Sequence, residues 1–405
     1  MGYRFGSADI AFLACAAGHA ALAEVDRLEL TPATHLHDLE RVRRDHGEHA
    51  AALVETVRLR RKAVAKLHDA GDWLFTDDAL QQATPTPVAR HRAARLAGRA
   101  VHDVTCSIGA ELVELAEVCP AVVGSDLDEV RLAIAAHNLG SRWAPLSGAD
   151  PVEHRNVLLA KADAVVPSST GTVIIADPAR RADGRRTHDP ARLQPPLPDL
   201  LDAYAGRDLA VKCAPGLDFD RLDWRGEIEV VSLDGAVREA CLWSEGLAES
   251  GVTRRATVLS SRGGPQVLTD AEPDELPERP PGEWIIDPDG AIVRAGLVRH
   301  YAARHGLWQL DPHIAYLTGD AVPEGVRGFR IEDRLELREK TLRRELARRD
   351  CGALEILVRG VDVDPDALRK RLKLKGSVPY TLVITRIGRA AAVFLCTSHA
   401  PAAVR

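Results

Sequence analysis

Between residues 100 and 244, short apolar runs alternate with stretches of helical character, and this alternation constrains the fold more than any other feature. The first five runs are dominated by Val, Ile, Leu and Ala, and they cover residues 100–104, 121–124, 157–159, 172–176 and 208–213. Such runs are typical of parallel strands that are buried on both faces. The chain is therefore predicted to form an α/β fold built on a doubly wound sheet, with functional residues just after the strands, where such sheets bind ligands.

The rest of the chain divides by composition and periodicity. Before residue 75, apolar residues recur at spacings of three and four, which predicts a helical region over 1–75. The α/β domain is expected over 76–265, and a Pro-rich acidic stretch predicts a linker over 266–282. A small segment over 283–327 and an α+β module over 328–405 complete the chain. In that module the pattern predicts, in order, a helix over 334–349, a strand over 354–359, a helix over 365–374, and strands over 380–386 and 391–397.

Charge is distributed unevenly along the 405 residues. The formal net charge is −6, and residues 331–405 hold 16 Lys and Arg against 10 Asp and Glu, which makes this part +6 and the remainder −12. A basic C-terminal module on an acidic body is the pattern expected of a polyanion-binding domain. Charge alone supports equally well the simpler interpretation that its Arg-rich helix faces are merely solvated.

Cysteine usage and hydropathy point to the cellular setting. The seven cysteines are scattered, and neither they nor the histidines show the spacing of a zinc site. The chain opens on no charged-then-apolar leader, and it has no run of about 18 apolar residues that would span a bilayer. These features predict a reduced, cytoplasmic protein with no bound metal and no membrane partner.

The turn after the first strand reads Asp103-Val104-Thr105-Cys106-Ser107-Ile108-Gly109 before a helix begins. A tight turn of small residues lets the backbone approach a ligand and offers it the N–H groups of the helix start. Dinucleotide sites use three glycines here, with pyrophosphate on the helix terminus, whereas this turn keeps only Gly109. A carboxylate at Asp103 would repel pyrophosphate but suits the ammonium group of an amino-acid ligand. The turn thus favours S-adenosylmethionine (SAM) over a nicotinamide dinucleotide.

Acidic residues also follow the second and third strands. Asp126 ends the second strand, about 20 residues after the glycine turn, where a carboxylate is placed to hold a ribose diol. Asp128 lies close behind it and is the better candidate for the N-cap of the next helix, expected over 129–139. After the third strand, Asp163 is placed to accept the amino group of an adenine, although a lone surface Asp explains it nearly as well.

The fourth strand ends in Asp177-Pro178-Ala179-Arg180-Arg181, the most informative string of the chain. A buried strand has no structural need for Asp-Pro at its end. Proline fixes φ and redirects the chain, so Asp177 should point into the cleft at the sheet edge. Its carboxylate would accept from a substrate amino group, and the two arginines would contact phosphate or stack on a base. A plain turn is the simpler alternative.

These motifs together resemble the class I SAM-dependent methyltransferases, which have a Rossmann-like sheet, over about residues 70–260. More narrowly, the chain resembles bacterial methyltransferases that carry a C-terminal THUMP-like domain. The strings that carry this resemblance are Leu80-Gln81-Gln82-Ala83-Thr84-Pro85, Asp177-Pro178-Ala179-Arg180-Arg181, Lys212-Cys213-Ala214-Pro215-Gly216, Arg238-Glu239-Ala240, Ile292-Val293-Arg294-Ala295-Gly296, Ala315-Tyr316-Leu317-Thr318 and Glu355-Ile356-Leu357-Val358-Arg359-Gly360-Val361. Two positions depart from the usual patterns. Ser107 replaces the first glycine of the turn, and Ala179-Arg180 stands where methyltransferases of amino groups usually have proline and an aromatic residue.

The resemblance implies SAM as the cofactor and structured RNA as the substrate, with a base as the methyl acceptor. It also implies a small ferredoxin-like segment over 283–327 and a THUMP-like, RNA-holding domain over 328–405. The expected cofactor-binding residues are Asp103, Thr105, Gly109, Asp126, Leu127 and Asp163, and the expected catalytic residues are Asp177, Pro178 and Arg180. Contacts to the RNA backbone are expected from Arg343, Arg344, Arg348, Lys370, Arg371 and Lys373.

Several alternatives stay open. Cys213 and Glu239 resemble the nucleophile and base of uracil-C5 methyltransferases, although a cysteine at a strand end is more often a small buried hydrophobe. The substrate is alternatively a protein or a small molecule, with the C-terminal module serving dimerisation. A third possibility is a protein that binds SAM and RNA without catalysis, with Ala179 marking a decayed acceptor site. Lys212 either faces the acceptor or covers the sheet edge, and Asn138 is expected at a helix end that borders the cofactor.

Overall fold

The computed structural model describes residues 3–143, 156–179, 181–182, 185–186 and 189–399 of the chain. The chain divides into two compact units, Met1–Gly226 with Glu239–Ala248, and Glu227–Arg238 with Glu249–Arg405. No single helix in the described part is long and apolar enough to cross a membrane. Helices Ser7–Leu13 and Ala16–Val25 meet that criterion only as a pair, and the pair is bent by 82°.

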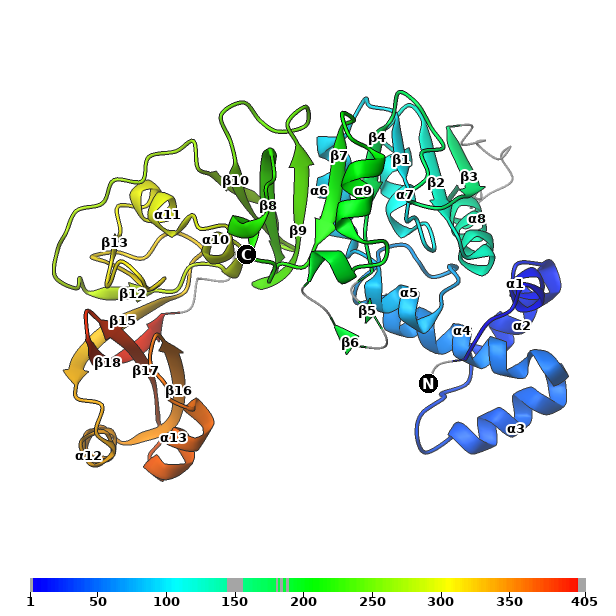
Figure 1. Cartoon of the computed structure of the whole chain (residues 1–405). Coiled ribbons are helices and arrows are strands. Elements are labelled where there is room, and N and C mark those ends of the chain that lie inside the picture. The colour runs from blue at the N-terminus through cyan, green and yellow to red at the C-terminus, as the bar shows by residue number, and fades with distance from the viewer. Residues whose placement is uncertain (1–2, 144–155, 180, 183–184, 187–188, 400–405) are drawn as a thin grey trace. The chain divides into compact units, whose positions relative to one another are not determined.

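The first unit begins with helices, as the apolar periodicity predicts. They are α1 (Ser7–Leu13), α2 (Ala16–Val25), α3 (His35–His46), α4 (Ala50–Ala63), α5 (Asp77–Gln82) and α6 (Thr86–Arg95) (Figure 1). The apolar stripe of α4 is buried through residues such as Leu53 and Val57. The helix breaks after Leu13, and Gly18 of α2 then lies so close to Phe12 that a Cβ on it would come within 2.0 Å of the Phe12 carbonyl oxygen. A glycine is therefore required at this bend.

The sheet of the first unit contains the five predicted parallel strands and one antiparallel strand. They are β1 (Val101–Asp103), β2 (Val122–Asp126), β3 (Val157–Lys161), β4 (Val173–Ala176), β7 (Leu209–Cys213) and the end of β9 (Ala236–Ser244). Their order is β9-β7-β4-β1-β2-β3, and only β9 runs antiparallel to its neighbour β7. The strand order reverses between β1 and β4, so the crevice outside the ends of these two strands is where such a sheet binds ligands.

Helices and a small hairpin connect these strands. The helices are α7 (Ala110–Ala116), α8 (Glu129–Trp143) and α9 (Leu197–Ala203), and the hairpin pairs β5 (Arg181–Ala182) with β6 (Arg185–Arg186). Both α6 and α8 contact α7, and α8 also contacts β2 and β3. The N-terminal helices and this layer share one apolar core, which includes Leu53, Leu112 and Ile134.

The second unit begins with three paired strands. β10 (Arg254–Ser260) pairs in parallel with β8 (Gly226–Leu233) and antiparallel with β11 (Gly263–Thr269). β11 includes the first four residues of the stretch that the sequence predicts as a linker.

A second sheet contains the remaining strands of this unit. The strands of this sheet and the helices between them are, in chain order, β12 (Trp284–Ile286), α10 (Gly290–Arg294), α11 (Val298–Arg304), β13 (Trp308–Gln309), β14 (Leu317–Gly319), β15 (Gly328–Leu335), α12 (Glu339–Arg348), β16 (Cys351–Arg359), α13 (Pro365–Leu372), β17 (Val378–Ile387) and β18 (Ala390–His399). The strand order is β13-β14-β12-β15-β18-β17-β16. Leu342 and Leu346 of α12 pack with Leu368 and Leu372 of α13 in one apolar core.

The helix predicted over 334–349 is wrong at its start. Residues up to Leu335 belong to β15, which pairs with β18, and the helix begins at Glu339. Phe329 is buried and Ile331, Asp333 and Leu335 are half-buried, whereas Arg330, Glu332 and Arg334 are exposed. This alternation has the period of a strand, but the charged residues Glu332 and Arg334 within it obscure the apolar pattern.

Candidate active site

A cavity of about 600 Å³ opens at the carboxyl edge of the first unit's sheet. Its position is the one that the strand order favours, and its volume lies in the usual range of small-molecule sites. Six of the predicted site residues line it: Asp103, Thr105, Asp126, Leu127, Asp163 and Asp177. Gly109 and Pro178 do not line it, and Arg180 lies outside the described residues.

The turn after β1 holds a buried carboxylate. Asp103 is 4% exposed, and its Oδ1 accepts the backbone N–H of Thr105 at 3.0 Å and the Thr105 hydroxyl at 3.3 Å. Burial raises the pKa of Asp103 to about 6, although the Thr105 N–H and the charge of Lys212 act in the opposite direction. A cationic ligand beside this carboxylate would offset the cost of burying its charge.

Two residues of the same turn have left-handed backbone conformations. Gly109, the N-cap of α7, has a φ of 76°, and a Cβ on it would lie 3.1 Å from the Cβ of Ala135. Gly109 therefore sets the shape of the turn and its packing on α8. Ser107 has a φ of 50° and lines the cavity. Its buried hydroxyl has no hydrogen-bond partner within the described part of the chain, and a polar ligand in the cavity would supply one.

The carboxylate of Asp126 is fixed by backbone groups on both of its oxygens. Oδ2 accepts the N–H of Ser107 at 3.0 Å, and Oδ1 accepts the N–H of Asp128 at 2.9 Å. Each oxygen keeps a second lone pair, so the group can still accept the two hydroxyls of a ribose. Asp128 instead accepts the N–H groups of Val130 and Arg131 at the start of α8, which confirms its predicted capping role.

Leu127 and Asp163 line the cavity from the turns after β2 and β3. Leu127 is 60% exposed, so its side chain offers a flat ring an apolar contact. Asp163 uses one oxygen to accept the N–H of Val165 at 3.1 Å. The pair therefore presents an apolar surface and a hydrogen-bond acceptor, the two features that an adenine requires.

Asp177 follows the last residue of β4 and is held from two directions. Its backbone N–H donates to the hydroxyl of Thr105 at 2.7 Å. Its Oδ2 accepts the ammonium group of Lys212 at 2.5 Å. Its position at the cavity wall is therefore fixed by residues from β7 and from the turn after β1.

The residues after Asp177 shape a loop whose two ends are joined. Pro178 is buried, so its contribution is to direct the chain rather than to contact a ligand. Ala179 lines the cavity and exchanges two backbone hydrogen bonds with Gln194, at 2.7 and 3.0 Å. Gln194 also lines the cavity.

Lys212 is 6% exposed and lines the cavity. Besides Asp177, its Nζ donates to the hydroxyl of Thr84 at 2.6 Å and lies 3.7 Å from Oε2 of Glu111. Burial lowers the pKa of Lys212, whereas the charge of Asp177 acts to raise it. Such a lysine at a cavity wall is a candidate for chemistry as well as for structure.

A buried arginine completes this ionic network. Arg92 is 2% exposed and pairs with both Glu111 and Glu239. Arg92 comes from α6, Glu111 from α7 and Glu239 from β9, so the three groups meet only in the folded chain. Together with Lys212, they form a buried chain of charges that ends at Asp177.

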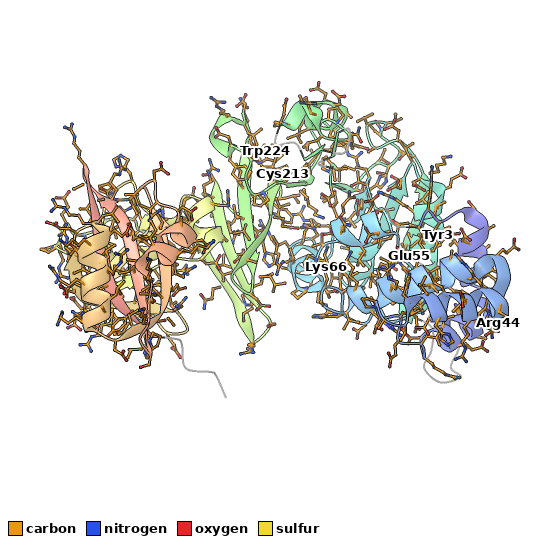
Figure 2. All side chains as sticks on the ribbon, turned by 90° about the horizontal axis from the view of Figure 1, so that it is seen from below. Tyr3, Arg44, Glu55, Lys66, Cys213 and Trp224 are labelled. Carbon is orange, nitrogen blue, oxygen red and sulfur yellow. The ribbon has the colours of Figure 1, made fainter. Side chains whose placement is uncertain are left out.

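One wall of the cavity is formed by residues to which the sequence assigned no chemical role. Asp78 and Gln82 of α5 and the following Thr84 all line the cavity. Lys66, labelled in Figure 2, donates to the carbonyl groups of Leu80 and Gln81 at 2.9 and 2.8 Å and so fixes the end of α5. The one sequence signal for this wall is the resemblance of residues 80–85 to the corresponding string of known methyltransferases.

Two further expectations are changed by the structure. Cys213, labelled in Figure 2, is buried and does not line the cavity, and Glu239 is paired with Arg92. Neither is placed to act on a pyrimidine, so the geometry argues against the uracil-C5 alternative. Asn138 is not at a helix end: it lies within α8, fully buried, where it binds the backbone of Leu74 and Ile108.

The cavity favours a cationic ligand. Within the part of the chain that the structure describes, eight charged side chains line it: Asp78, Asp103, Glu111, Asp126, Asp163 and Asp177 against Arg131 and Lys212. Six carboxylates facing two cations attract positive charge. Among the described residues, no group of three or more His, Cys, Asp or Glu side chains is placed to hold a metal ion. The fold and the site are therefore those of an α/β protein whose cavity, at the edge of a Rossmann-like sheet, suits a nucleoside-like, positively charged ligand.

Two relatives in Mycobacterium tuberculosis, in strains CDC 1551 / Oshkosh and ATCC 25618 / H37Rv, identify the family. Each is 56% identical to this chain over 351 residues, which cover 84% of this chain and 94% of the relative. Both are named as uncharacterised SAM-dependent methyltransferases. The chain belongs to the SAM-dependent methyltransferases, and SAM is its cofactor.

The two ends of the chain match known domain families. Residues 326–398 match the THUMP domain-like family, and residues 7–63 match a domain of unknown function, DUF8688. A crystal structure of a methyltransferase from Porphyromonas gingivalis W83 aligns with a TM-score of 0.73 over 97% of this chain and 99% of that chain, at 18% identity. That likeness confirms the predicted fold: an α/β methyltransferase sheet with a helical N-terminus and a C-terminal THUMP-like domain.

Proposed function

We propose that this SAM-dependent methyltransferase acts on structured RNA and transfers the methyl group to a base held beside Asp177. The observation that carries the proposal is the match of residues 326–398 to the THUMP domain-like family. The charge of +6 over residues 331–405, on a chain whose remainder is −12, supports a polyanionic partner independently.

Seven of the basic residues of this domain lie on two helices that contact each other. Arg343 on α12 donates to the carbonyl group of Arg371 on α13 at 2.7 Å. The residues expected to contact RNA are all exposed on or directly after these helices: Arg343, Arg344, Arg348, Lys370, Arg371 and Lys373. The arginines of α12 pair with Glu339 or Glu345, whereas the part of the chain that the structure describes gives Lys370 and Lys373 no ion pair. The two lysines are thus the charges whose removal disturbs the domain least.

We assign the cofactor to the carboxylates of the cavity. Asp103 would hold the ammonium group of SAM, Asp126 its ribose hydroxyls and Asp163 its adenine amino group, with Leu127 against the ring. When bound, SAM supplies a methyl group on a sulfonium, which is transferred by in-line displacement. The protein then needs chiefly to align the acceptor. Asp177 is suited to this because its Oδ1 makes no hydrogen bond within the described residues and is available to a substrate amino group.

The test is to incubate the purified protein with methyl-labelled SAM and total RNA from cells that lack the gene, and then to digest the RNA to nucleosides. We expect one labelled nucleoside, which disappears with Asp177→Ala. We also expect the double variant Lys370→Glu/Lys373→Glu to bind RNA more weakly, with a reduced dependence on salt, while its SAM affinity stays unchanged. Unlabelled RNA from a protein that binds SAM would contradict the proposal and redirect the search to protein or small-molecule acceptors. Labelled 5-methyluridine would restore the role of Cys213.

A further inference from the structure

Lys212 lies in the wall of the cavity beside Asp177, and several titratable or polar groups surround it. Asp177 after β4 and Thr84 after α5 accept hydrogen bonds from Lys212 Nζ, and Glu111 of α7 lies 3.7 Å away. The charges of Arg92 on α6 and of Asp103 on β1 also act on it. Fixing the position of Asp177 would require only one of these contacts, so the arrangement points to a further role for the lysine.

The hydrogen bonds leave one position on the lysine nitrogen unfilled. A neutral amine has two N–H groups and one lone pair, arranged tetrahedrally. Asp177 and Thr84 take the two N–H groups, at 2.5 and 2.6 Å. The contact with Glu111 at 3.7 Å is longer than a hydrogen bond. A neutral Lys212 would therefore keep both hydrogen bonds and still have a lone pair, and Lys212 lines the cavity.

The surroundings favour the neutral form more than those of an ordinary lysine. Burial lowers the pKa of Lys212 and the charge of Arg92 lowers it further, against the opposing charges of Asp177 and Asp103. SAM, bound in the same cavity, adds a positive charge that disfavours the ammonium form again. Enzymes prepare lysines for proton transfer in this way, by burial and neighbouring charge.

The described lining of the cavity provides no aromatic ring on which a base could stack. A flipped base is commonly stacked between aromatic or apolar side chains. Among the described residues, no Phe, Tyr, Trp or His lines this cavity. The described lining therefore offers a base apolar contacts, hydrogen bonds and charge, but no aromatic ring to stack on.

We propose that Lys212 is the general base of the reaction, and that the acceptor is an atom that becomes nucleophilic only when it loses a proton. This proposal rests on the proposed function in taking RNA as the substrate, and it deepens it by naming the chemistry of the acceptor. On a base of RNA, the ring N–H of a guanine or uracil has this chemistry. An exocyclic amino group, or a ring nitrogen that already has a free lone pair, does not need such a base.

The step balances without any further reactant. Lys212 Nζ takes the proton from the ring N–H group, and the electron pair of that bond remains on the acceptor nitrogen. The acceptor atom forms a bond to the methyl carbon while the carbon–sulfur bond breaks, and that electron pair stays on sulfur. Lys212 is left as an ammonium group that is ion-paired with Asp177 and hydrogen-bonded to the Thr84 hydroxyl. It returns the proton to water when the products leave.

The first test compares Lys212→Arg with Lys212→Met, using Lys161→Arg as the control. Lys161 is an exposed lysine at the end of β3 that does not line the cavity. Arginine keeps the positive charge and can still pair with Asp177, but it is not deprotonated in proteins. We expect both Lys212 variants to lose about 10²–10⁴-fold in kcat while SAM binding, measured by calorimetry, is retained. Activity of Lys212→Arg close to that of the wild type would show that the residue only positions Asp177 and would overturn the proposal.

The second test identifies the acceptor and the proton carrier. Mass spectrometry of the labelled nucleoside should find a methyl group on the former ring N–H of a guanine or uracil. A methyl group on an exocyclic amino group, or on a ring nitrogen without a proton, would overturn the proposal. Below the pKa of Lys212, kcat should rise about tenfold per pH unit, and Asp177→Asn should move this rise to lower pH.

The third test does not depend on turnover. The chain has only eight lysines, so the Lys212 signal of selectively labelled protein is assignable by its loss in Lys212→Arg, and NMR titration without cofactor gives its pKa. A pKa below the ordinary value of about 10.4 supports the proposal, and a pKa at or above it contradicts the proposal. This result is independent of whether RNA is labelled, so failure of the general-base proposal is distinguishable from failure of the RNA proposal.

Discussion

The hydroxyl of Thr105 accepts the backbone N–H of Asp177 at 2.7 Å and donates to the carboxylate of Asp103 at 3.3 Å. One side chain thus joins the turn after β1, which we assign to the cofactor, to the turn after β4, which we assign to the acceptor. Methyl transfer needs the two ligands in line, and a misalignment of one ångström is costly. Thr105 is therefore expected to matter more for the rate than for binding of either ligand.

Thr105→Val tests this coupling, because valine keeps the shape of the side chain and removes both hydrogen bonds. We expect kcat to fall about tenfold, corresponding to about 1.4 kcal/mol, with a smaller change in the dissociation constant of SAM. Thr172→Val is the control, since the Thr172 hydroxyl bonds to Ser169 and Arg207 rather than to cavity residues. Equal kcat values for the two variants would argue against the coupling.

Arg92→Met should destabilise the first unit strongly. Arg92 is 2% exposed and pairs with Glu111 and Glu239, so its removal leaves the buried carboxylate of Glu239 without a cation among the described residues and that of Glu111 with only Lys212, at 3.7 Å. Loss of one partner from a buried ionic group typically costs about 3–5 kcal/mol. Arg99→Met, which breaks the half-exposed pair with Asp208, should cost no more than about 1 kcal/mol. Urea unfolding of both variants measures the difference, and a mild effect of Arg92→Met would contradict the structural role of the network.

Gly109→Ala should disturb the cofactor turn. Gly109 and Gly98 have nearly the same φ, 76° and 75°, so alanine carries the same left-handed backbone cost, about 1–2 kcal/mol, at both. Only at Gly109 would the new Cβ meet a neighbour, Ala135, whereas nothing lies within 4 Å at Gly98. Gly109→Ala should therefore lower both the thermal midpoint and SAM affinity, and Gly98→Ala only the midpoint. Equal SAM affinities in the two variants would contradict the assignment of this turn to the cofactor site.

The affinity for SAM should depend on pH through Asp103. Burial raises the pKa of this carboxyl to about 6, and only its ionised form, which predominates above that pH, attracts an ammonium group. As the pH falls through 6, protons compete with the cofactor, and the affinity should decrease by up to about tenfold per pH unit. Calorimetry between pH 5 and 7.5 measures this. Asp103→Asn should bind SAM weakly with no such pH dependence, and a flat wild-type profile would contradict the assignment.

The sequence was sufficient to predict the catalytic sheet because its signals are local. Each parallel strand is a compact apolar run, and the structure places β1, β4 and β7 within a residue or two of the predicted runs. Asp103, Asp126, Asp163 and Asp177 follow strand ends, and parallel strands bring their ends to one edge. The strand β15 was missed because its outward positions carry charges that resemble the polar face of a helix.

The remainder of the site had no local signal. Thr84, Glu111 and Lys212 come from three elements, and nothing in the sequence spacing indicates that they meet. The pairing of Arg92 with Glu239 joins residues that are 147 positions apart. Gly109 was predicted to touch the cofactor, whereas the structure explains it by backbone conformation and by packing on Ala135. Contacts of this kind depend on tertiary packing, which sequence spacing does not encode.

The most direct test of the account is to titrate SAM into Asp126→Asn and Asp128→Asn by calorimetry. The two carboxylates are two residues apart, but Asp126 lines the cavity and Asp128 caps α8. Loss of a charge-assisted hydrogen bond costs about 1.5–3 kcal/mol. We therefore expect Asp126→Asn to weaken SAM binding by about tenfold or more, and Asp128→Asn to leave it unchanged. Wild-type affinity in Asp126→Asn, or an equal loss in both variants, would contradict the assignment of this cavity as the cofactor site.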